Sequence, residues 1–527
     1  MNPNDIRAFL GSELAQDDPN FLNYAVPRDD LLEELRDDRN RLSLISAARG
    51  SGKSGLLLCH EEDIKKRFPE NSVIIRKYYA DVQLPGANIE TNAFVNYWRG
   101  VMLEWIFKEI AKKHGVDFAD PVIGLEQCKN SENSELRAVF TILDRLGTTK
   151  FPGERLEWDP GLTPELIERA LKSSESTIWL LLDEMDDHYS NTYSRNNGIV
   201  GLLQAARDCC SRYPGINIRI TIRPHILTIL KTNYDIMQKF REHELTLSWH
   251  PKSLRTMIAN RIVWFDSTGD AEQQEFQLIA DQFEQTEEQK QCGIIESRFS
   301  DFDLSFTAGH RSRYRAFHTV SMGRPRWMLE FCAIALRIAG SKKTVEVSDF
   351  QKAMYEYGNN RIQFLSGEHR FHCPDLEKLL SRLVSFRKVQ LGSTFDLQTF
   401  IEKNLIESEL VPLNEGETTR SKALEIALVL FMVEFIRAKQ TLGGRNDHRF
   451  YSFIDRPSLL ASWSHEKNIT WEVHPVFARG MNIIDSKVYR VGSEYRTLGK
   501  NKAYKPQGQV IERKGKQRKG RRSSNID

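Results

Sequence analysis

The run Ala-Ala-Arg-Gly-Ser-Gly-Lys-Ser at residues 47–54 contains the side chains that a phosphate-binding loop requires. Gly50 and Gly52 would let backbone N–H groups close around the phosphates of a nucleotide. Lys53 would reach the β and γ oxygens, and Ser54 would ligate a magnesium ion. The motif usually begins with glycine, and Ala47 stands in that place here. Alanine is small enough for the loop to close.

A strand before this loop and a helix after it would distinguish a phosphate site from a simple glycine turn. Residues 41–46 alternate apolar and polar side chains as a strand does, and residues 53–66 are typical of an apolar helix. The alternative, a glycine turn that only starts a helix, therefore has the weaker support. The predicted nucleotide-contacting residues of the loop are Arg49, Gly50, Ser51, Gly52, Lys53, Ser54 and Gly55.

A second chemical group follows about 130 residues later, where the apolar run at residues 177–182 ends in Asp183 and Glu184. Asp183 would hold the magnesium ion through water, and Glu184 would polarise the attacking water for γ-phosphate cleavage. Asp186 and Asp187 add negative charge beside them. By itself this pattern is more often an ordinary strand end. Together with the phosphate loop, it indicates a catalytic site that includes Lys53.

The elements that must position these groups form an α/β pattern. Strands alternate with helices, as in a parallel sheet with buried strands. Further along, residues 325–338 and 347–364 are predicted lid helices, the second with Asp349 as a plausible cap. We therefore expect a P-loop fold with a five-stranded parallel sheet and a helical lid. The five predicted strands are residues 41–46, 71–82, 177–182, 217–222 and 244–249.

A separate, mostly helical unit is predicted after about residue 370. Its element order, three helices at residues 376–385, 396–405 and 420–437 and a strand at 469–473, is compatible with a winged helix. Trp471 and His474 are interpreted as packed side chains rather than a base-stacking platform and a metal ligand.

The ordered set of motifs resembles the AAA+ and STAND ATPases, and in particular their initiator-like Orc/Cdc6 branch together with bacterial P-loop ATPases of that organisation. The resemblance covers about residues 25–365 and includes Ile-Thr-Ile-Arg-Pro at 220–224 and Gly-Arg-Pro-Arg at 323–326. It implies that Thr221 is a polar sensor of the γ-phosphate and that Arg326 is a lid arginine placed over the nucleotide. A solvent-facing arginine at a helix start is the alternative for Arg326.

The same resemblance implies an arginine finger from a neighbouring subunit, and hence a homo-oligomer or a partner effector protein. Arg223 and Arg241 are the candidates, and each could equally be a surface arginine. The implied function is an ATP-driven, Mg²⁺-dependent switch with slow, partner-regulated hydrolysis, in a bacterial regulatory or anti-phage module. The alternative is an ATP-dependent DNA-binding initiator or loader. A nucleotide-binding scaffold without turnover is disfavoured because Asp183 and Glu184 are both present.

The composition limits the remaining classes. The formal net charge of +2 hides a tail from residue 487 onward, which has thirteen Lys or Arg and three acidic residues. This tail could bind DNA or another polyanion, or it could be a solvated disordered terminus. The candidate nucleic-acid contacts are Arg513, Lys514, Lys516, Arg518, Lys519, Arg521 and Arg522.

The seven cysteines are scattered without paired CxxC or Cys/His spacing, which indicates a reducing compartment and no zinc site. We find no signal-peptide pattern and no span of about 20 apolar residues, and therefore expect a cytoplasmic protein without a membrane partner. The predicted domains are an N-terminal extension (1–28), the ATPase core (29–250), a helical lid with a polar insertion (251–368), a winged-helix-like domain (369–486) and a basic, disordered tail (487–527).

Overall fold

The computed structural model divides the chain into two compact units, Met1–Ile484 and Asp485–Asp527. The second unit, which contains the predicted basic tail and all seven of its candidate nucleic-acid residues, lies outside the described residues. Most of the predicted polar insertion lies outside them as well. The structure describes residues 3–12, 14–37, 39–79, 90–148, 161–187, 189–268, 287–300, 315–369, 373, 375–386, 390–407, 418–442, 448–460 and 468–480.

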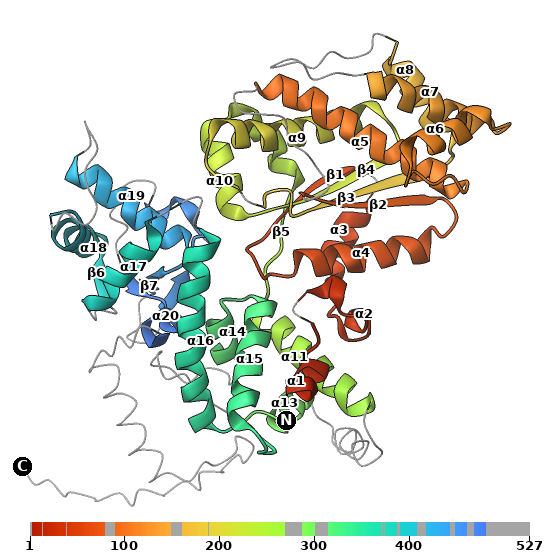
Figure 1. Ribbon diagram of the computed structural model, residues 1–527. Coiled ribbons are helices and arrows are strands. Elements are labelled where there is room, and N and C mark those ends of the chain that lie inside the picture. The colour runs from red at the N-terminus through yellow and green to blue at the C-terminus, as the bar shows by residue number, and fades with distance from the viewer. Residues whose placement is uncertain are drawn as a thin grey trace, which may run out of the picture. The chain divides into compact units, whose positions relative to one another are not determined.

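The first unit contains a five-stranded parallel sheet in the order β2-β3-β4-β1-β5 (Figure 1). All five predicted strands are present, so the predicted α/β class and parallel sheet are confirmed. The strand before the phosphate loop, β1, does not pair with β3, because β4 lies between them. The strands are β1 (Leu42–Ser46), β2 (Ser72–Tyr78), β3 (Thr177–Asp183), β4 (Ile216–Ile222) and β5 (Glu244–Thr246).

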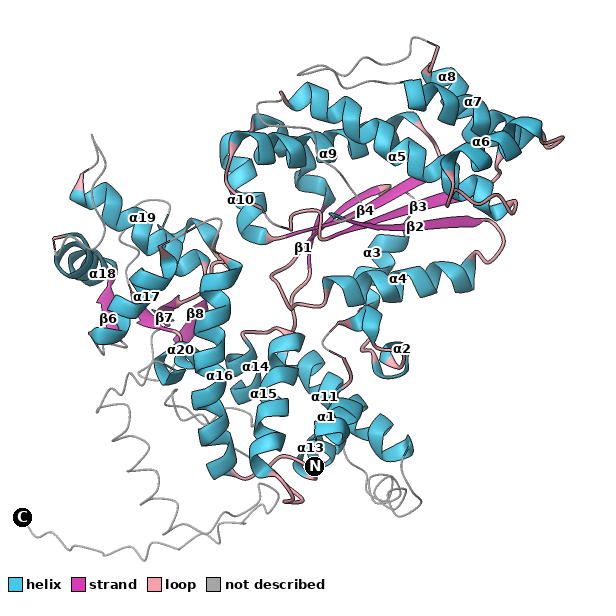
Figure 2. Cartoon of the chain, in the orientation of Figure 1, coloured by secondary structure: helices cyan, strands magenta, loops and turns pink. Residues whose placement is uncertain are grey.

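The sheet is buried on both faces, as the apolar run in β3 predicts. Leu180 and Leu182 belong to one hydrophobic cluster, and the intervening Leu181 belongs to another. This alternation is the two-residue period of a strand between two helical layers. Helices α3 (Asp29–Arg36) and α4 (Lys53–Arg67) cover one face (Figure 2).

The other face is covered mainly by α5 (Thr91–Lys113) and α9 (Tyr193–Arg212), which pack closely because Gly201 lets Phe94 approach α9. Three further helices between α5 and β3 extend this layer: α6 (Pro121–Asn130), α7 (Ser134–Thr148) and α8 (Pro164–Ser173). After β4 the chain forms α10 (Pro224–Asn233) and the 3₁₀ segment η3 (Asp235–His243).

A second hydrophobic cluster joins the helices that follow β5. Helix α1 (Pro3–Leu10) at the start of the chain packs into the same cluster through Ile6, Phe9 and Leu10. The connection to the sheet passes through η1 (Ala15–Asp17) and α2 (Phe21–Tyr24). The other helices of the cluster are α11 (Pro251–Thr268), α13 (Glu287–Glu296), α14 (Arg315–Ser321), α15 (Pro325–Ala339) and α16 (Val347–Glu368).

The region after residue 369 has its own hydrophobic cluster and an antiparallel sheet of order β6-β9-β7-β8. One strand was predicted here, so β6, β7 and β8 are new, and the helix predicted to reach Arg437 ends at Met432. A positive φ of 59° at Glu434 turns the chain from that helix into β7. The elements are α17 (Leu376–Ser385), β6 (Gln390–Ser393), α18 (Thr394–Ile401), the π-helical segment η5 (Glu402–Ile406), α19 (Thr419–Met432), β7 (Ile436–Thr441), β8 (His448–Tyr451), η6 (Pro457–Leu460), β9 (Ile469–Val473) and α20 (Pro475–Gly480).

Among the described residues, every helix is too short or too polar to cross a membrane. The apolar helix α19 contributes Ile426, Ala427 and Leu430 to the hydrophobic cluster of its own region.

Candidate functional site

The loop after β1 has the backbone that its glycines allow. Gly50 and Gly52 have φ angles of 81° and 86°, in the left-handed region that side chains with a Cβ avoid. Gly52 is the residue before α4, so the helix begins at Lys53 with its free N–H groups and positive end at the loop. Ala47 is buried, and its N–H donates to the carbonyl of Ile222 at the end of β4.

Lys53 lies inside this loop rather than in solvent. Its Nζ donates to the carbonyl oxygens of Ala47 at 2.9 Å and Ala48 at 3.3 Å. Burial lowers the pKa of the ammonium group, while the nearby carboxylates of Asp186 and Asp183 oppose that shift. The loop therefore holds a buried cation where an anion at the helix start would meet it.

Asp183 ends β3 and is fully buried. Its Oδ1 accepts the hydroxyl of Thr221 at 2.7 Å and the N–H of Glu184 at 3.0 Å. Its Oδ2 has no hydrogen-bond partner among the described residues. A buried carboxylate oxygen without a donor is costly unless a cation or water compensates it.

Glu184 follows in a left-handed conformation, with a φ of 55°. Its N–H also lies 3.2 Å from the hydroxyl oxygen of Thr221 on β4. Burial raises the pKa of the Glu184 carboxyl, as do Asp183 and Asp187, whereas Lys53 and Arg223 oppose the rise. A carboxylate with a raised pKa at the end of a buried strand is suited to accept a proton from water near neutral pH.

The phosphate loop and the carboxylates meet through Arg76 of β2. One guanidinium nitrogen of Arg76 lies 3.1 Å from the carbonyl oxygen of Ser54 and 3.7 Å from Oδ2 of Asp183. The same Arg76 nitrogen therefore contacts both the first turn of α4 and the end of β3. The residues after the carboxyl ends of β1 and β3 thus lie close together, although β4 separates the two strands in the sheet.

The residues present fit a magnesium ion held together with a nucleotide. Ser54 offers a hydroxyl group and Asp183 offers Oδ2, and hydroxyl and carboxylate oxygens are ligands that Mg²⁺ prefers. Mg²⁺ is commonly bound through one or two carboxylates plus substrate phosphates. No group of three or more His, Cys, Asp or Glu side chains among the described residues is arranged to hold a metal without such help.

The two predicted sensors contact different parts of the site. Thr221 bridges Asp183 and Glu184, as described above. Arg326 lies in the first turn of α15, and its N–H donates to the carbonyl oxygen of Gly50 at 3.2 Å. A Cβ on Gly50 would lie 3.2 Å from the indole of Trp327. The start of the lid helix therefore contacts the loop directly.

The two finger candidates have different surroundings. Arg223 forms ion pairs with Asp186 and Asp187 of its own chain. Arg241 is exposed on η3, and no ion pair is found for it within the described part of the chain. Nothing in these contacts places either arginine at a neighbouring subunit's nucleotide.

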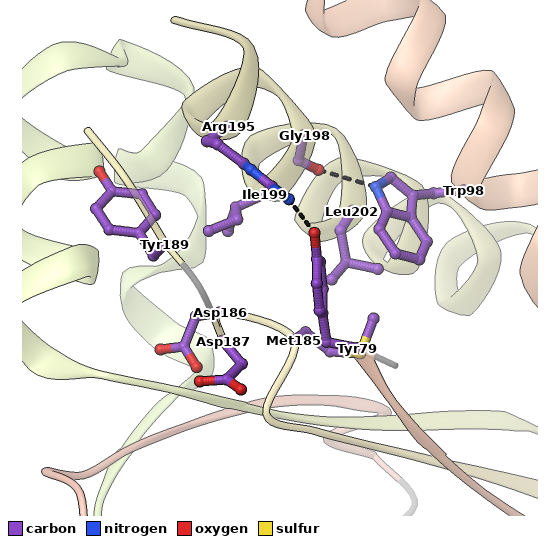
Figure 3. Close-up of a pocket in the computed structure, with 10 residues that line it drawn as sticks. All are labelled: Tyr79, Trp98, Met185, Asp186, Asp187, Tyr189, Arg195, Gly198, Ile199 and Leu202. Carbon is purple, nitrogen blue, oxygen red and sulfur yellow. Dashed lines mark hydrogen bonds between the residues drawn. The ribbon is translucent and has the colours of Figure 1, made fainter. Parts of the chain in front are cut away.

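A small pocket adjoins the turn after β3 (Figure 3). Asp186 and Asp187 lie on one side of it, and Tyr79 and Arg195 lie in hydrogen-bond contact on the other. Its accessible volume is about 10 Å³, which is enough for about one water molecule. The pocket is thus too small for a second ligand.

The sequence did not identify Arg76, Trp249 or Phe21 as members of the site. The indole N–H of Trp249 donates to the carbonyl oxygen of Ser51 at 2.8 Å, and the ring of Phe21 fills the space beside Gly55. A charged residue following Val73 to Ile75 in an apolar strand was a signal for Arg76. The other two had none, because their proximity to the loop depends on the tertiary fold.

The two side chains of the C-terminal region interpreted as packed are buried. Trp471 donates its indole N–H to the hydroxyl of Thr394 at 3.1 Å. Burial lowers the pKa of His474 well below its usual value, and Arg437 and Arg324 add to this effect.

Comparison with known proteins gives structural likeness without sequence likeness. No protein-family model and no curated protein matches the chain. The similar solved structures include the ORC2 protein of Aeropyrum pernix in ADPNP-ADP complexes (12% identity, TM-score 0.40, 92% of this chain and 98% of that chain) and in an ADP form (13%, 0.35, 93% and 98%). Cdc6p from Pyrobaculum aerophilum is also similar (11%, 0.31, 93% and 98%). Because these TM-scores are below 0.5, we draw the function from the geometry of the site.

Proposed function

We propose that this chain binds ATP with Mg²⁺ at the loop formed by residues 47–54 and hydrolyses it with Glu184 as the base, as an AAA+/STAND-type molecular switch. The observation that carries the proposal is the position of Arg76, one nitrogen of which contacts both the backbone carbonyl of Ser54 and the carboxylate of Asp183. The residues that supply the magnesium-ligating hydroxyl and carboxylate of such a site must be neighbours in space.

The chemistry that the bound metal would supply is neutralisation of the phosphate charge, through Ser54 and Asp183. The chain's own residues would do the rest. Lys53 would exchange the carbonyls of Ala47 and Ala48 for phosphate oxygens, and Glu184 would orient the attacking water in line with the γ-phosphate.

We also propose that the lid, residues 251–368, responds to the nucleotide, because the backbone of Arg326 contacts the carbonyl of Gly50. A phosphate that rearranges the loop would shift the start of α15 and bring the Arg326 guanidinium to the nucleotide. Placement of this switch in a bacterial regulatory or anti-phage module is implied only by the resemblance of its sequence motifs.

The test of this function compares nucleotide binding with turnover. Glu184→Gln should bind a fluorescent ATP analogue within about threefold of the wild-type Kd and should lower ATP hydrolysis at least about 100-fold. Glu126→Gln, an exposed glutamate of α6, is the matched control and should change neither quantity. If Glu184→Gln hydrolyses ATP at the wild-type rate, Glu184 is not the base.

A second candidate function, an ATP-dependent DNA-binding initiator or loader, is favoured by the surface of β8. Arg449 and Arg456 each lie 5.2 Å from the ring centre of Tyr451 on this edge strand. Basic and aromatic side chains together suit a nucleic-acid backbone and its bases. We propose that α17 to β9 form a winged helix in which β8 extends the wing.

Binding of a labelled DNA duplex at several salt concentrations tests this second function. The double variant Arg449→Gln/Arg456→Gln should weaken binding and reduce the salt slope by about two, one for each lost phosphate contact. A chain cut after Ile484 measures the contribution of the basic tail separately. Affinity that is independent of salt and unchanged in both variants would exclude this candidate.

A further inference from the structure

Arg223 connects the end of β4 to the turn that follows the catalytic strand. Its backbone N–H donates to Oδ2 of Asp186 at 2.7 Å, and its Nη2 lies 2.9 Å from Oδ1 of Asp187. Its Nε lies 3.8 Å from the same Asp186 oxygen. Only 12% of the Arg223 side chain is exposed. The arginine therefore contacts the turn with both backbone and side chain, and it is directed inward.

This turn needs such support because of how Glu184 is held. A φ of 55° is unfavourable by about 1 kcal/mol or more for a residue with a Cβ, so the surrounding contacts must maintain it. Before the turn, the Glu184 N–H contacts Thr221; after it, Asp186 and Asp187 contact Arg223. Thr221 belongs to β4 and Arg223 directly follows that strand, so the end of β4 supports the turn at both of its ends.

The charges around the turn also require a cation. Asp186 is only 3% exposed and its Oδ1 has no hydrogen-bond partner within the described residues. Glu184 faces Asp183 and Asp187 as like charges, Tyr78 from β2, and the cations Lys53 and Arg223. Loss of Arg223 would leave the carboxylates of Asp186 and Asp187 without their cation, although Asp186 is buried.

We propose that Arg223 is an in-chain positioning residue that fixes the orientation of Glu184, and that it acts on its own subunit rather than on a neighbour's nucleotide. This inference rests on the ATPase function proposed above. A finger role would require the arginine to leave Asp186 and Asp187 and would expose the buried Asp186 carboxylate without its partner.

Subunit mixing distinguishes action in the same chain from action on a neighbour. Arg223→Gln should lower kcat about 100-fold and change KM for ATP less than about threefold, because the base is misplaced while the phosphate loop is intact. Lys53→Ala has a defective loop but an intact Arg223. A mixture of the two variants should hydrolyse ATP no faster than the sum of its parts. Arg99→Gln, which removes a partly buried ion pair between Arg99 of α5 and Asp208 of α9, is the control for charge and should retain wild-type kcat.

Rescue by a conservative variant supplies a readout that simple destabilisation would not change. Arg223→Lys keeps the charge but loses the forked guanidinium, so kcat should recover to about tenfold below wild type while KM for ATP stays within about threefold. Asp187→Asn weakens only the side-chain contact and keeps the bond from the Arg223 N–H to Asp186. It should lower kcat less than Arg223→Gln does, and it serves if Arg223→Gln does not fold.

Three results would overturn the inference: activity restored by mixing, Arg223→Gln activity within threefold of wild type, or a KM for ATP that rises in Arg223→Gln as much as kcat falls. Wild-type protein that fails to bind ATP would instead overturn the proposed function itself.

Discussion

Two regions form the candidate site, the phosphate loop at residues 47–54 (the loop wall) and the carboxylate turn at residues 183–187 (the turn wall). Their shapes have different origins. The phosphate loop owes its shape to backbone conformation, with left-handed Gly50 and Gly52 and a lysine held by main-chain carbonyls. The carboxylate turn contains no glycine, and side-chain contacts from Thr221 and Arg223 hold it in place. The loop should therefore be sensitive to an added Cβ, whereas the turn should be sensitive to loss of particular polar atoms.

The largest effect is expected from the cation of the loop wall. Lys53→Ala should weaken binding of a fluorescent ATP analogue by about 100-fold or more, because it removes the buried charge that phosphate would meet. Lys65→Ala, an exposed lysine of the same helix paired with Glu61 and Glu62, is the control and should bind normally. Equal affinity in the two variants would mean that phosphate does not enter this loop.

The backbone origin of the loop wall can be tested with a pair of glycines. Gly50 has a φ of 81° and lies beside Trp327, whereas Gly115 has a φ of 82° and open space around it. Each change to alanine should reduce the free energy of unfolding by about 1–2 kcal/mol. Only Gly50→Ala should also weaken nucleotide binding, by about tenfold. If both or neither change binding, the geometry at Gly50 is not what forms the site.

A smaller effect is expected in the turn wall, where the hydroxyl group of Thr221 should matter more than the volume of its side chain. Thr221→Val keeps the volume but loses the contacts with Asp183 and Glu184, so kcat should fall about tenfold. Thr221→Ser keeps the hydroxyl and should remain within about threefold of wild type. Steady-state ATPase assays would measure both, and equal losses in the two variants would contradict a role for the hydroxyl.

The loop wall is easier to propose from the sequence than the turn wall, for a physical reason. The residues of the loop are consecutive, so their types alone indicate phosphate binding. The role of Arg223 and the presence of Arg76 depend on the strand order β2-β3-β4-β1-β5, which brings β2 and β4 to either side of β3. Local patterns predict that strands exist, but they do not specify which strands are neighbours.

The C-terminal region shows a second limit. Arg437 is the last residue of the helix predicted for residues 420–437. It lies instead in β7, directly opposite Glu472 of β9, and the two side chains form a buried ion pair at 2.5 Å. A charged residue inside a short strand hides the pattern of a buried strand, because the sequence does not show which residue of the neighbouring strand pairs with it.

The placement of both walls around one triphosphate is tested most directly by the coupling between Asp183 and the loop. Affinity for a non-hydrolysable ATP analogue would be measured with Mg²⁺ and with EDTA, for wild type and Asp183→Asn. Mg²⁺ should tighten binding about tenfold or more in the wild type and by less than about threefold in the variant, with equal affinities in EDTA. Full Mg²⁺-dependent tightening in Asp183→Asn would place the metal, and with it the triphosphate, away from the end of β3.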